Sequence, residues 1–421
     1  MRWLVVAIAV ALLAPVSRTL AADVQWESAA TGTTIEGEIR KPPATTDQKT
    51  TPTVIYLKNL SVPRIGQEAD DAILADLTET GHLVLVLDYA RHAKAISPDL
   101  NADVLKLRRD IADAKSKSLL TDHLVDVDRL FIVPEGFRLK RDLEFARDGE
   151  RVLAMDVIYP SKPKQPVPAL MEITCDNVNR MGAGSLLYCH DTLLEGGAVA
   201  GFAVAMIDHP VRPPYKGIDD PMPQLIHRLK AAVRTLRAGG NEFGMNGKIG
   251  VIGFSRGGPM AGFLAATGAR KDLEGDGSPD DQSSGGSLEG SPRPHQGVSS
   301  AVQAAVVHGN RYDYLAIGPD DPMYTRFERA WGPRDENRER WATHGVVHYL
   351  TREAAPMFLN TSDTESPEFR EGLATLASRL KALGVQHVHQ VDRDGRGHQV
   401  STDPATLRAV YAFLHAHLEP R

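Results

Sequence analysis

A serine, an acid and a histidine follow one another in the second half of the chain, in an order that suits nucleophilic catalysis. Ser255 lies in the turn Gly253-Phe254-Ser255-Arg256-Gly257, between an apolar run (249–252) and a helix-forming segment (260–266). A buried strand, a sharp glycine-flanked turn and a helix form a nucleophile elbow, which exposes the serine hydroxyl at a helix N-terminus. The alternative is an ordinary strand-to-helix loop, because glycine and serine are common in turns.

Asp363 and His398 are the candidate acid and base. Asp363 follows the apolar run 356–360, and His398 lies in a Gly-rich segment after the apolar run 385–391. Catalytic groups in open α/β sheets gather at the carboxyl ends of strands, and the order Ser, Asp, His fits such a sheet. Glu365 is the reserve candidate for the acid. Alternatively, Asp363 caps the helix that begins near residue 367, and His398 is an exposed loop histidine.

Apolar runs alternate with helical patterns along most of the chain, which predicts an α/β fold with a mostly parallel sheet flanked by helices. The strand and helix pattern of the first third returns further on: residues 52–66 align without gaps to 168–182, and 81–89 resemble 201–209. Gly136 stands at the position that matches Ser255, so the first copy has no nucleophile. Two explanations stay open: an internal duplication of half a sheet, and convergence of two similar layouts.

Changes in composition suggest how the chain is divided. We expect a signal peptide at 1–22, a smaller N-terminal α/β domain at 23–148 with a soft boundary near 140–150, and a larger α/β domain at 149–421. Residues 272–296 are nearly all Gly, Ser, Pro and acid, which predicts a flexible insertion. Residues 308–355 are rich in aromatic side chains and are expected to form a cap; we favour packing over sugar stacking for most of these rings.

The N-terminus and the overall charge bear on location and partners. The first 22 residues have the pattern of a secretory signal: Arg2, then an apolar stretch, then small residues around 19–22 for cleavage. The apolar stretch is short for a membrane span, and an uncleaved anchor is the alternative. We therefore expect a periplasmic or secreted protein with no stable membrane span after cleavage. The net charge of −6 gives no reason to expect a nucleic-acid partner. The two cysteines, Cys175 and Cys189, are expected to form a disulfide in an oxidising compartment, with two buried free thiols as the alternative.

Residues 150–421 resemble the α/β-hydrolase superfamily, especially secreted esterases related to acetyl-xylan and feruloyl esterases and the prolyl-oligopeptidase-like branch. The matching segments are MDVIYPSKPKQPVPALMEI, GFAVAMID, GFSRGG, PMFLNTSD and GRGHQV. The resemblance places Ser255, Asp363 and His398 on the family's nucleophile, acid and base. Arg256 makes the turn similar to the G-x-S-R-x-G elbow of glucuronoyl esterases, whose arginine helps to stabilise the oxyanion. Phe254 and Pro259 depart from that family, so a uronate ester is only suggested.

The resemblance implies an exported serine esterase that acts through an acyl-enzyme on carboxylic esters. Its expected partner is a small-molecule or polysaccharide ester, with acylated or uronate-bearing polysaccharide as the expected polymer. Many related esterases carry His-Gly-Gly-Gly where this chain has Thr174-Cys175-Asp176-Asn177. The backbone N–H groups of Arg256 and of Cys175 or Asp176 are the expected oxyanion donors. No cofactor is expected, and no metal, because zinc-type spacing such as H-E-x-x-H is absent. The alternatives are a prolyl-oligopeptidase-like peptidase and a non-catalytic carbohydrate- or partner-binding protein. The sequence does not indicate an oligomeric state.

Overall fold

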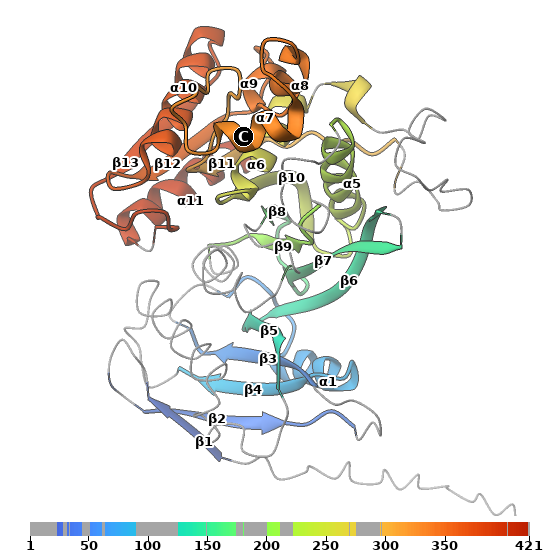
Figure 1. The fold of residues 1–421 in the computed structure, drawn as a ribbon. Coiled ribbons are helices and arrows are strands. Elements are labelled where there is room, and N and C mark those ends of the chain that lie inside the picture. Colours follow the sequence, from blue (N-terminus) through green and yellow to red (C-terminus); the bar gives the residue numbers. More distant parts are fainter. Residues whose placement is uncertain are drawn as a thin grey trace, which may run out of the picture.

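A computed structural model gives the arrangement of the chain as two β-sheets with helices around them (Figure 1). It describes residues 23–27, 32, 34–43, 51–60, 64–89, 125–148, 150–173, 180, 200–210, 222–268, 270–274, 295, 297–401 and 403–419. The expected signal peptide, the helix expected at 104–114, both cysteines and most of the expected insertion lie outside the described residues. Within the described ranges, no helix is both long enough and apolar enough to cross a membrane.

The first sheet has five strands in the order β1-β2-β4-β3-β5. Their bounds are β1 Asp23–Glu27, β2 Thr34–Arg40, β3 Thr51–Lys58, β4 Leu83–Asp88 and β5 Val125–Pro134. β3 pairs in parallel with β4 and β5, whereas β2 is antiparallel to both β1 and β4. The central strands are continuous runs of buried β-branched and leucine side chains, as expected for strands covered on both faces. Helix α1 (Asp70–Glu79) packs against this sheet through Ile73, Leu74 and Leu77.

The second sheet has eight strands in the order β13-β12-β11-β10-β8-β9-β7-β6. Their bounds are β6 Phe137–Asp148, β7 Arg151–Pro160, β8 Val167–Ile173, β9 Ala203–Ile207, β10 Met245–Gly253, β11 Ala304–His308, β12 Met357–Ser362 and β13 His387–Asp392. All neighbouring pairs from β9 to β13 are parallel. Strand β7 is antiparallel to both of its neighbours, β9 and β6. The predicted mostly parallel sheet is confirmed.

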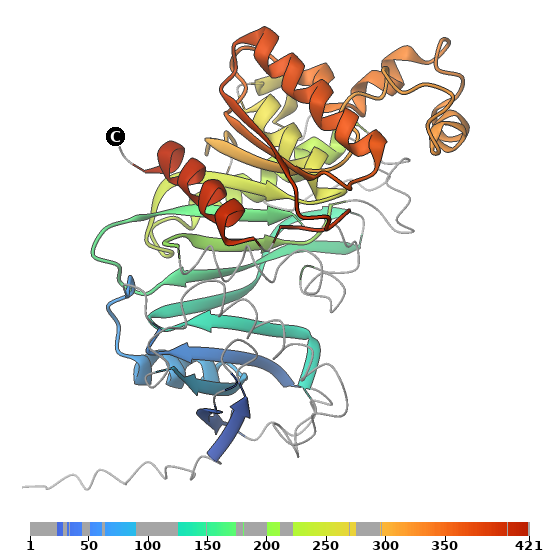
Figure 2. The same ribbon diagram turned by 90° about the vertical axis from the view of Figure 1, so that its left-hand side faces the viewer.

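Helices cover both faces of the second sheet (Figures 1 and 2). Apolar side chains of α5 (Gln224–Ala238), α6 (Gly257–Thr267) and α10 (Pro367–Leu383) share one core with β8 and β10. Helix α11 (Pro404–Leu418) lies on the other face, in a core that also contains the first sheet. Because successive strand residues alternate between the faces, Val251 points into the first of these cores and Ile252 into the second.

The first sheet repeats the order and direction of the first five strands of the second sheet: β1-β2-β4-β3-β5 corresponds to β6-β7-β9-β8-β10. The pairing register repeats as well. Thr53 pairs with Leu83 and Leu130 in the first sheet, and Ala169 pairs with Ala203 and Ile249 in the second. These are the residues that the sequence alignment superposes. Such agreement in order, direction and register is what a duplication predicts, and convergence does not require it.

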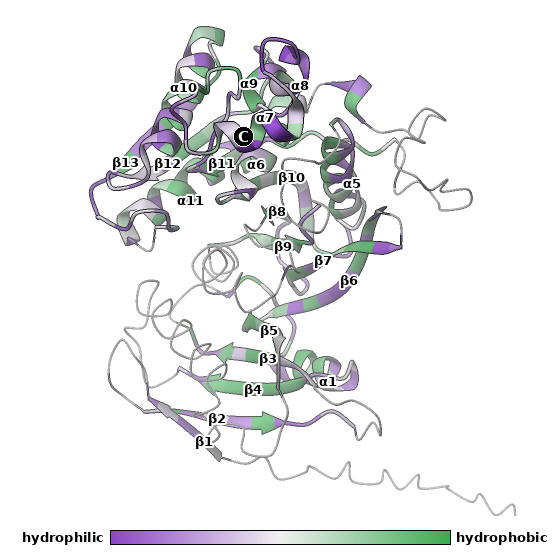
Figure 3. Cartoon of the chain, in the orientation of Figure 1, coloured by the Kyte–Doolittle hydropathy of each residue, from purple (hydrophilic) through white to green (hydrophobic). Residues whose placement is uncertain are grey.

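Strand β6 lies in the second sheet, although the sequence places residues 23–148 in the first domain. β6 forms a long antiparallel ladder with β7, from Phe137 opposite Pro160 to Asp148 opposite Arg151. The sheets therefore part at residues 135–136, and a boundary at 148 cuts the β6–β7 hairpin. Strand β6 was missed because many of its residues are charged, yet charged and apolar residues are interspersed along it, as the striped ribbon in Figure 3 shows.

The segment between β11 and β12 contains α7 (Tyr324–Trp331), α8 (Arg338–Thr343) and α9 (Val346–Tyr349), with a core of its own. Trp331 and Trp341 are almost fully buried and meet edge to face, with ring centroids 5.2 Å apart. The stacked Phe327 lies 5.1 Å from Trp331. These rings pack against one another within the segment, whereas Tyr312 and Tyr349 belong to the core of the second sheet.

Candidate active site

Ser255 occupies a sharp turn between β10 and α6. Its φ of 51° lies in the left-handed region, which costs energy for a residue with a side chain and is a known feature of active-site turns. Gly253 is required by the close approach of strand and helix, because a Cβ there would lie 1.9 Å from the Gly257 carbonyl oxygen. The matching residue of the first sheet, Gly136, also has a left-handed backbone conformation, with a φ of 77°. The turn has the geometry of a nucleophile elbow.

His398 lies between the serine and a carboxylate. Its Nε2 is 2.9 Å from Ser255 Oγ, and its Nδ1 is 2.7 Å from Glu365 Oε2. A carboxylate can only accept here, so Nδ1–H donates to Glu365 and Nε2 is left to accept the serine proton. The structure therefore joins Ser255, His398 and Glu365 in one hydrogen-bonded chain.

Asp363, the first choice for the acid, does not contact His398 in this structure. Strand β12 ends at Ser362, and the backbone N–H of Asp363 still bonds the carbonyl of Asp392 at 2.8 Å. The exposed Asp363 side chain then accepts a hydrogen bond from the N–H of Gly395 at 3.2 Å. A turn follows, closed by the N–H of Glu365 on the Ser362 carbonyl, and it turns the reserve acid toward the histidine. Glu365 therefore replaces Asp363 beside His398.

The environment of Glu365 keeps its carboxylate ionised. The residue is only 5% exposed, and this burial by itself would raise the pKa. The hydrogen bonds from His398 and from the Ser366 N–H outweigh burial and hold the pKa of Glu365 below its usual value. An ionised acceptor beside Nδ1 fixes the tautomer in which Nε2 faces the serine.

Three residues around the histidine and the serine were not singled out from the sequence for the contacts they make. Phe254 and Phe369 flank the His398 ring, each with its centroid 4.9 Å away. Asn310, just beyond the end of β11, donates from Nδ2 to the Ser255 carbonyl at 2.7 Å. Their positions after strand ends and at a helix start are weak signals, because many residues of the chain share them.

The expected oxyanion donors are only partly described. Arg256 is the N-cap residue of α6, so its backbone N–H belongs to the helix start next to the nucleophile. Its cationic side chain also acts on the nearby His209, whose pKa burial and this charge lower to about 3. Cys175, Asp176 and Cys189 lie outside the described residues, so the second donor and the disulfide stay predictions. Within the described ranges, no three His, Cys, Asp or Glu side chains gather as metal ligands would.

Comparison with known proteins supports the fold. A family model described as BD-FAE matches residues 155–289, which include β8, β10 and the serine turn. No curated protein sequence matches the chain.

Two solved structures have a similar arrangement. One is a truncated form of a carbohydrate esterase from gut microbiota, with 20% identity over 66% of this chain and 95% of that chain and a TM-score of 0.51. The other is a bifunctional GH43-CE from Bacteroides eggerthii, with 19% identity and a TM-score of 0.51. It covers 67% of this chain, but only 38% of that protein is matched. At this identity the likeness shows the fold, and the chain has the α/β-hydrolase fold.

Proposed function

Starting from the α/β-hydrolase fold, we propose that this chain is a serine hydrolase that cleaves carboxylic esters. One observation carries the proposal: Ser255 Oγ, the His398 ring and the Glu365 carboxylate form an unbroken hydrogen-bonded chain at the nucleophile elbow. This constellation activates a hydroxyl, which is a weak nucleophile by itself.

The proposed reaction has two halves. His398 Nε2 takes the proton of Ser255 as Oγ attacks the ester carbonyl, and the Glu365 carboxylate stabilises the imidazolium that forms. His398 then protonates the departing alcohol and leaves an acyl-enzyme on Ser255. In the second half a water loses its proton to the same Nε2 as its oxygen attacks the acyl carbon. The bond to Ser255 Oγ then breaks, His398 returns the proton to Oγ, and the acid is released. The Arg256 N–H at the start of α6 is the proposed donor to the oxyanion, together with Cys175 or Asp176.

The proposed substrates are acylated or uronate-bearing polysaccharides. The name of one of the similar structures refers to a carbohydrate esterase, which favours a sugar ester. Arg256 follows the nucleophile and brings a cation to the site edge, where a uronate carboxylate or an oxyanion would be attracted. The expected signal peptide at 1–22 places the enzyme in the periplasm or outside the cell, where such polymers occur.

The test is hydrolysis of p-nitrophenyl acetate and of a methyl uronate by the chain lacking residues 1–22, with Ser255→Ala alongside. We expect turnover that the substitution lowers by about 10³-fold or more, because it removes the nucleophile. The ratio of the turnover rates on the two substrates tests whether Arg256 favours a uronate. A folded protein that cleaves neither ester and does not react with a fluorophosphonate probe would contradict the proposal and favour a non-catalytic binding protein.

A further inference from the structure

The segment that carries His398 has little regular structure to hold it. It lies between the end of β13 at Asp392 and the start of α11 at Pro404. Gly395 and Gly397 both adopt left-handed φ angles, 66° and 65°. Glycine adds conformational freedom to a loop, so the position of the imidazole depends on side chains that tie this loop down.

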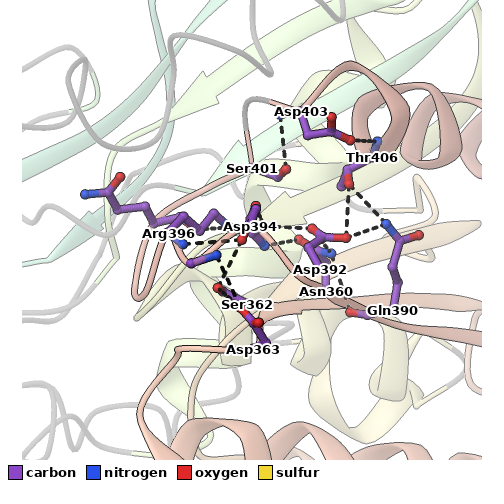
Figure 4. A network of polar contacts seen from close by, with 12 residues as sticks. Asn360, Ser362, Asp363, Gln390, Asp392, Asp394, Arg396, Ser401, Asp403 and Thr406 are labelled. Atoms are coloured by element: carbon purple, nitrogen blue, oxygen red, sulfur yellow. Dashed lines mark hydrogen bonds and ion pairs between the residues drawn. The ribbon is translucent and has the colours of Figure 1, made fainter.

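The side chain of Arg396 provides such ties, and Figure 4 shows it beside Asn360 and Asp392. Its Nη1 donates to Asp392 Oδ2 at 2.7 Å and also to the carboxylate of Asp394, and its Nη2 donates to Asn360 Oδ1 at 2.8 Å. Its Nε donates to the carbonyl of Gln399 at 2.9 Å. One guanidinium thus joins the end of β13, the neighbouring strand β12 and the residue that follows His398.

The carboxylate of Asp392, which binds this guanidinium, is itself held in place by several hydrogen bonds. Besides Arg396 it accepts hydrogen bonds from Asn360 Nδ2 at 3.0 Å, Gln390 Nε2 at 2.6 Å and Thr406 Oγ1 at 3.0 Å. The side chains of Arg396 and Asp392 are only 10% and 9% exposed. A nearly buried ion pair with this many partners has one favoured geometry, which is the property a positioning contact needs.

We propose that Arg396 is a positioning residue that holds the His398 ring between Ser255 and Glu365. The inference rests on the proposed function, because the position of the ring matters only if His398 transfers protons. Arg396 touches neither of the reacting atoms and acts through Asp392, Asn360 and the backbone at Gln399. A shift of the imidazole by about 1 Å is enough to lower the rate of the chemical step by about 10²-fold.

The test compares Arg396→Met, which keeps length without charge, with Arg396→Lys, which keeps charge but cannot reach all four acceptors. We expect kcat to fall by about 10²-fold in the first and about tenfold in the second, with KM changed less than about threefold. A second readout is the low-field proton NMR signal of His398 Nδ1–H, assigned by its loss in Glu365→Gln. This signal should shift or broaden in Arg396→Met, because it reports the geometry of the ring directly.

Arg138→Met is the matched control, since Arg138 also bonds two carboxylates but lies where the two sheets meet. It should lower thermal stability and leave kcat and the His398 signal unchanged. Wild-type kcat and an unchanged signal in a folded Arg396→Met would overturn the proposal, as would an equal loss of kcat in the control. If Arg396→Met does not fold, Arg396→Lys decides by the same two readouts. If the wild type cleaves no ester, the proposed function fails, and the NMR signal still decides whether Arg396 positions the ring.

Discussion

At the scale of single residues, two carboxylates near the end of β12 make different contacts. Asp363 is exposed and accepts from the N–H of Gly395, so it holds the histidine loop from outside. Glu365 has one more methylene, lies almost buried beyond the turn and reaches Nδ1 of His398. Their chemistry is the same, and the difference comes from the direction in which the turn after Ser362 points each side chain.

We predict that Glu365→Gln lowers kcat by about 10³-fold or more, whereas Asp363→Asn lowers it less than about tenfold. An amide at 365 can donate to Nδ1 and so favours the tautomer that cannot take the serine proton. An amide at 363 still offers an oxygen to Gly395. Steady-state kinetics of the two variants on one ester test this directly. The reverse ranking would return Asp363 to the role of acid.

Ser255 and His398 could be predicted because the backbone pattern around each is specific: strand, tight glycine turn and helix for one, and a Gly-rich loop after the last apolar run for the other. The choice between Asp363 and Glu365 could not, because both follow the same strand. Which one faces the histidine depends on a turn whose geometry is set by contacts with a loop about thirty residues away.

At the scale of elements, the sheets are joined by a polar cluster around Glu68. This residue precedes α1, and its Oε2 accepts from Nε of Arg138 in β6 at 2.7 Å. It also accepts from the Ser161 hydroxyl and, at 3.0 Å, from Lys162, both of which follow β7. The hydrogen bond from Arg138 is the main reason that the pKa of Glu68 falls to about 2.

We predict that Glu68→Gln lowers the free energy of unfolding by about 1–3 kcal/mol near neutral pH, because the partly buried Arg138 loses one of its two carboxylate partners. The pKa of Glu68 is depressed on folding, so its contribution is complete above the usual value of 4.5 and is lost as the pH falls toward 2. Urea unfolding of both proteins should therefore give a difference near about pH 7 that shrinks by about pH 3. A difference that does not change with pH would contradict the ionic role.

At the scale of the whole molecule, the chain is a series of strands in which one five-strand unit occurs twice. The second unit continues into β11, β12 and β13, and these strands bring Asn310, Glu365 and His398 to the serine. The first unit stops at β5, and at the elbow position it has Gly136 in place of a serine. The segment that follows β3 contacts the segment that follows β7, where Gly66 pairs with Pro163. We infer that the first unit is a diverged copy that supports the second.

The apolar runs of the central strands predict both sheets, but the sheet to which β6 belongs cannot be obtained from the sequence pattern alone. In residues 137–145 every second side chain is apolar except Arg141, a pattern that is compatible with an edge strand of either sheet. The turn at Glu135 and Gly136 determines which sheet β6 joins, since it separates β5 from the hairpin that β6 forms with β7.

This assignment predicts how shortened chains behave. A chain of residues 135–421 keeps β6, so β7 stays paired and Phe145, which is 1% exposed, stays in the core. A chain of residues 149–421 loses that strand, leaves the edge of β7 unpaired and opens a cavity where the Phe145 ring was, a loss of about 3–5 kcal/mol from the ring alone.

We expect the full chain without residues 1–22 to have the highest melting temperature and the chain 135–421 the next highest. The chain 149–421 should have the lowest melting temperature or aggregate. Thermal unfolding followed by circular dichroism ranks the three. Equal melting temperatures for the two shortened chains would put β6 outside the second unit and restore the boundary near residue 148.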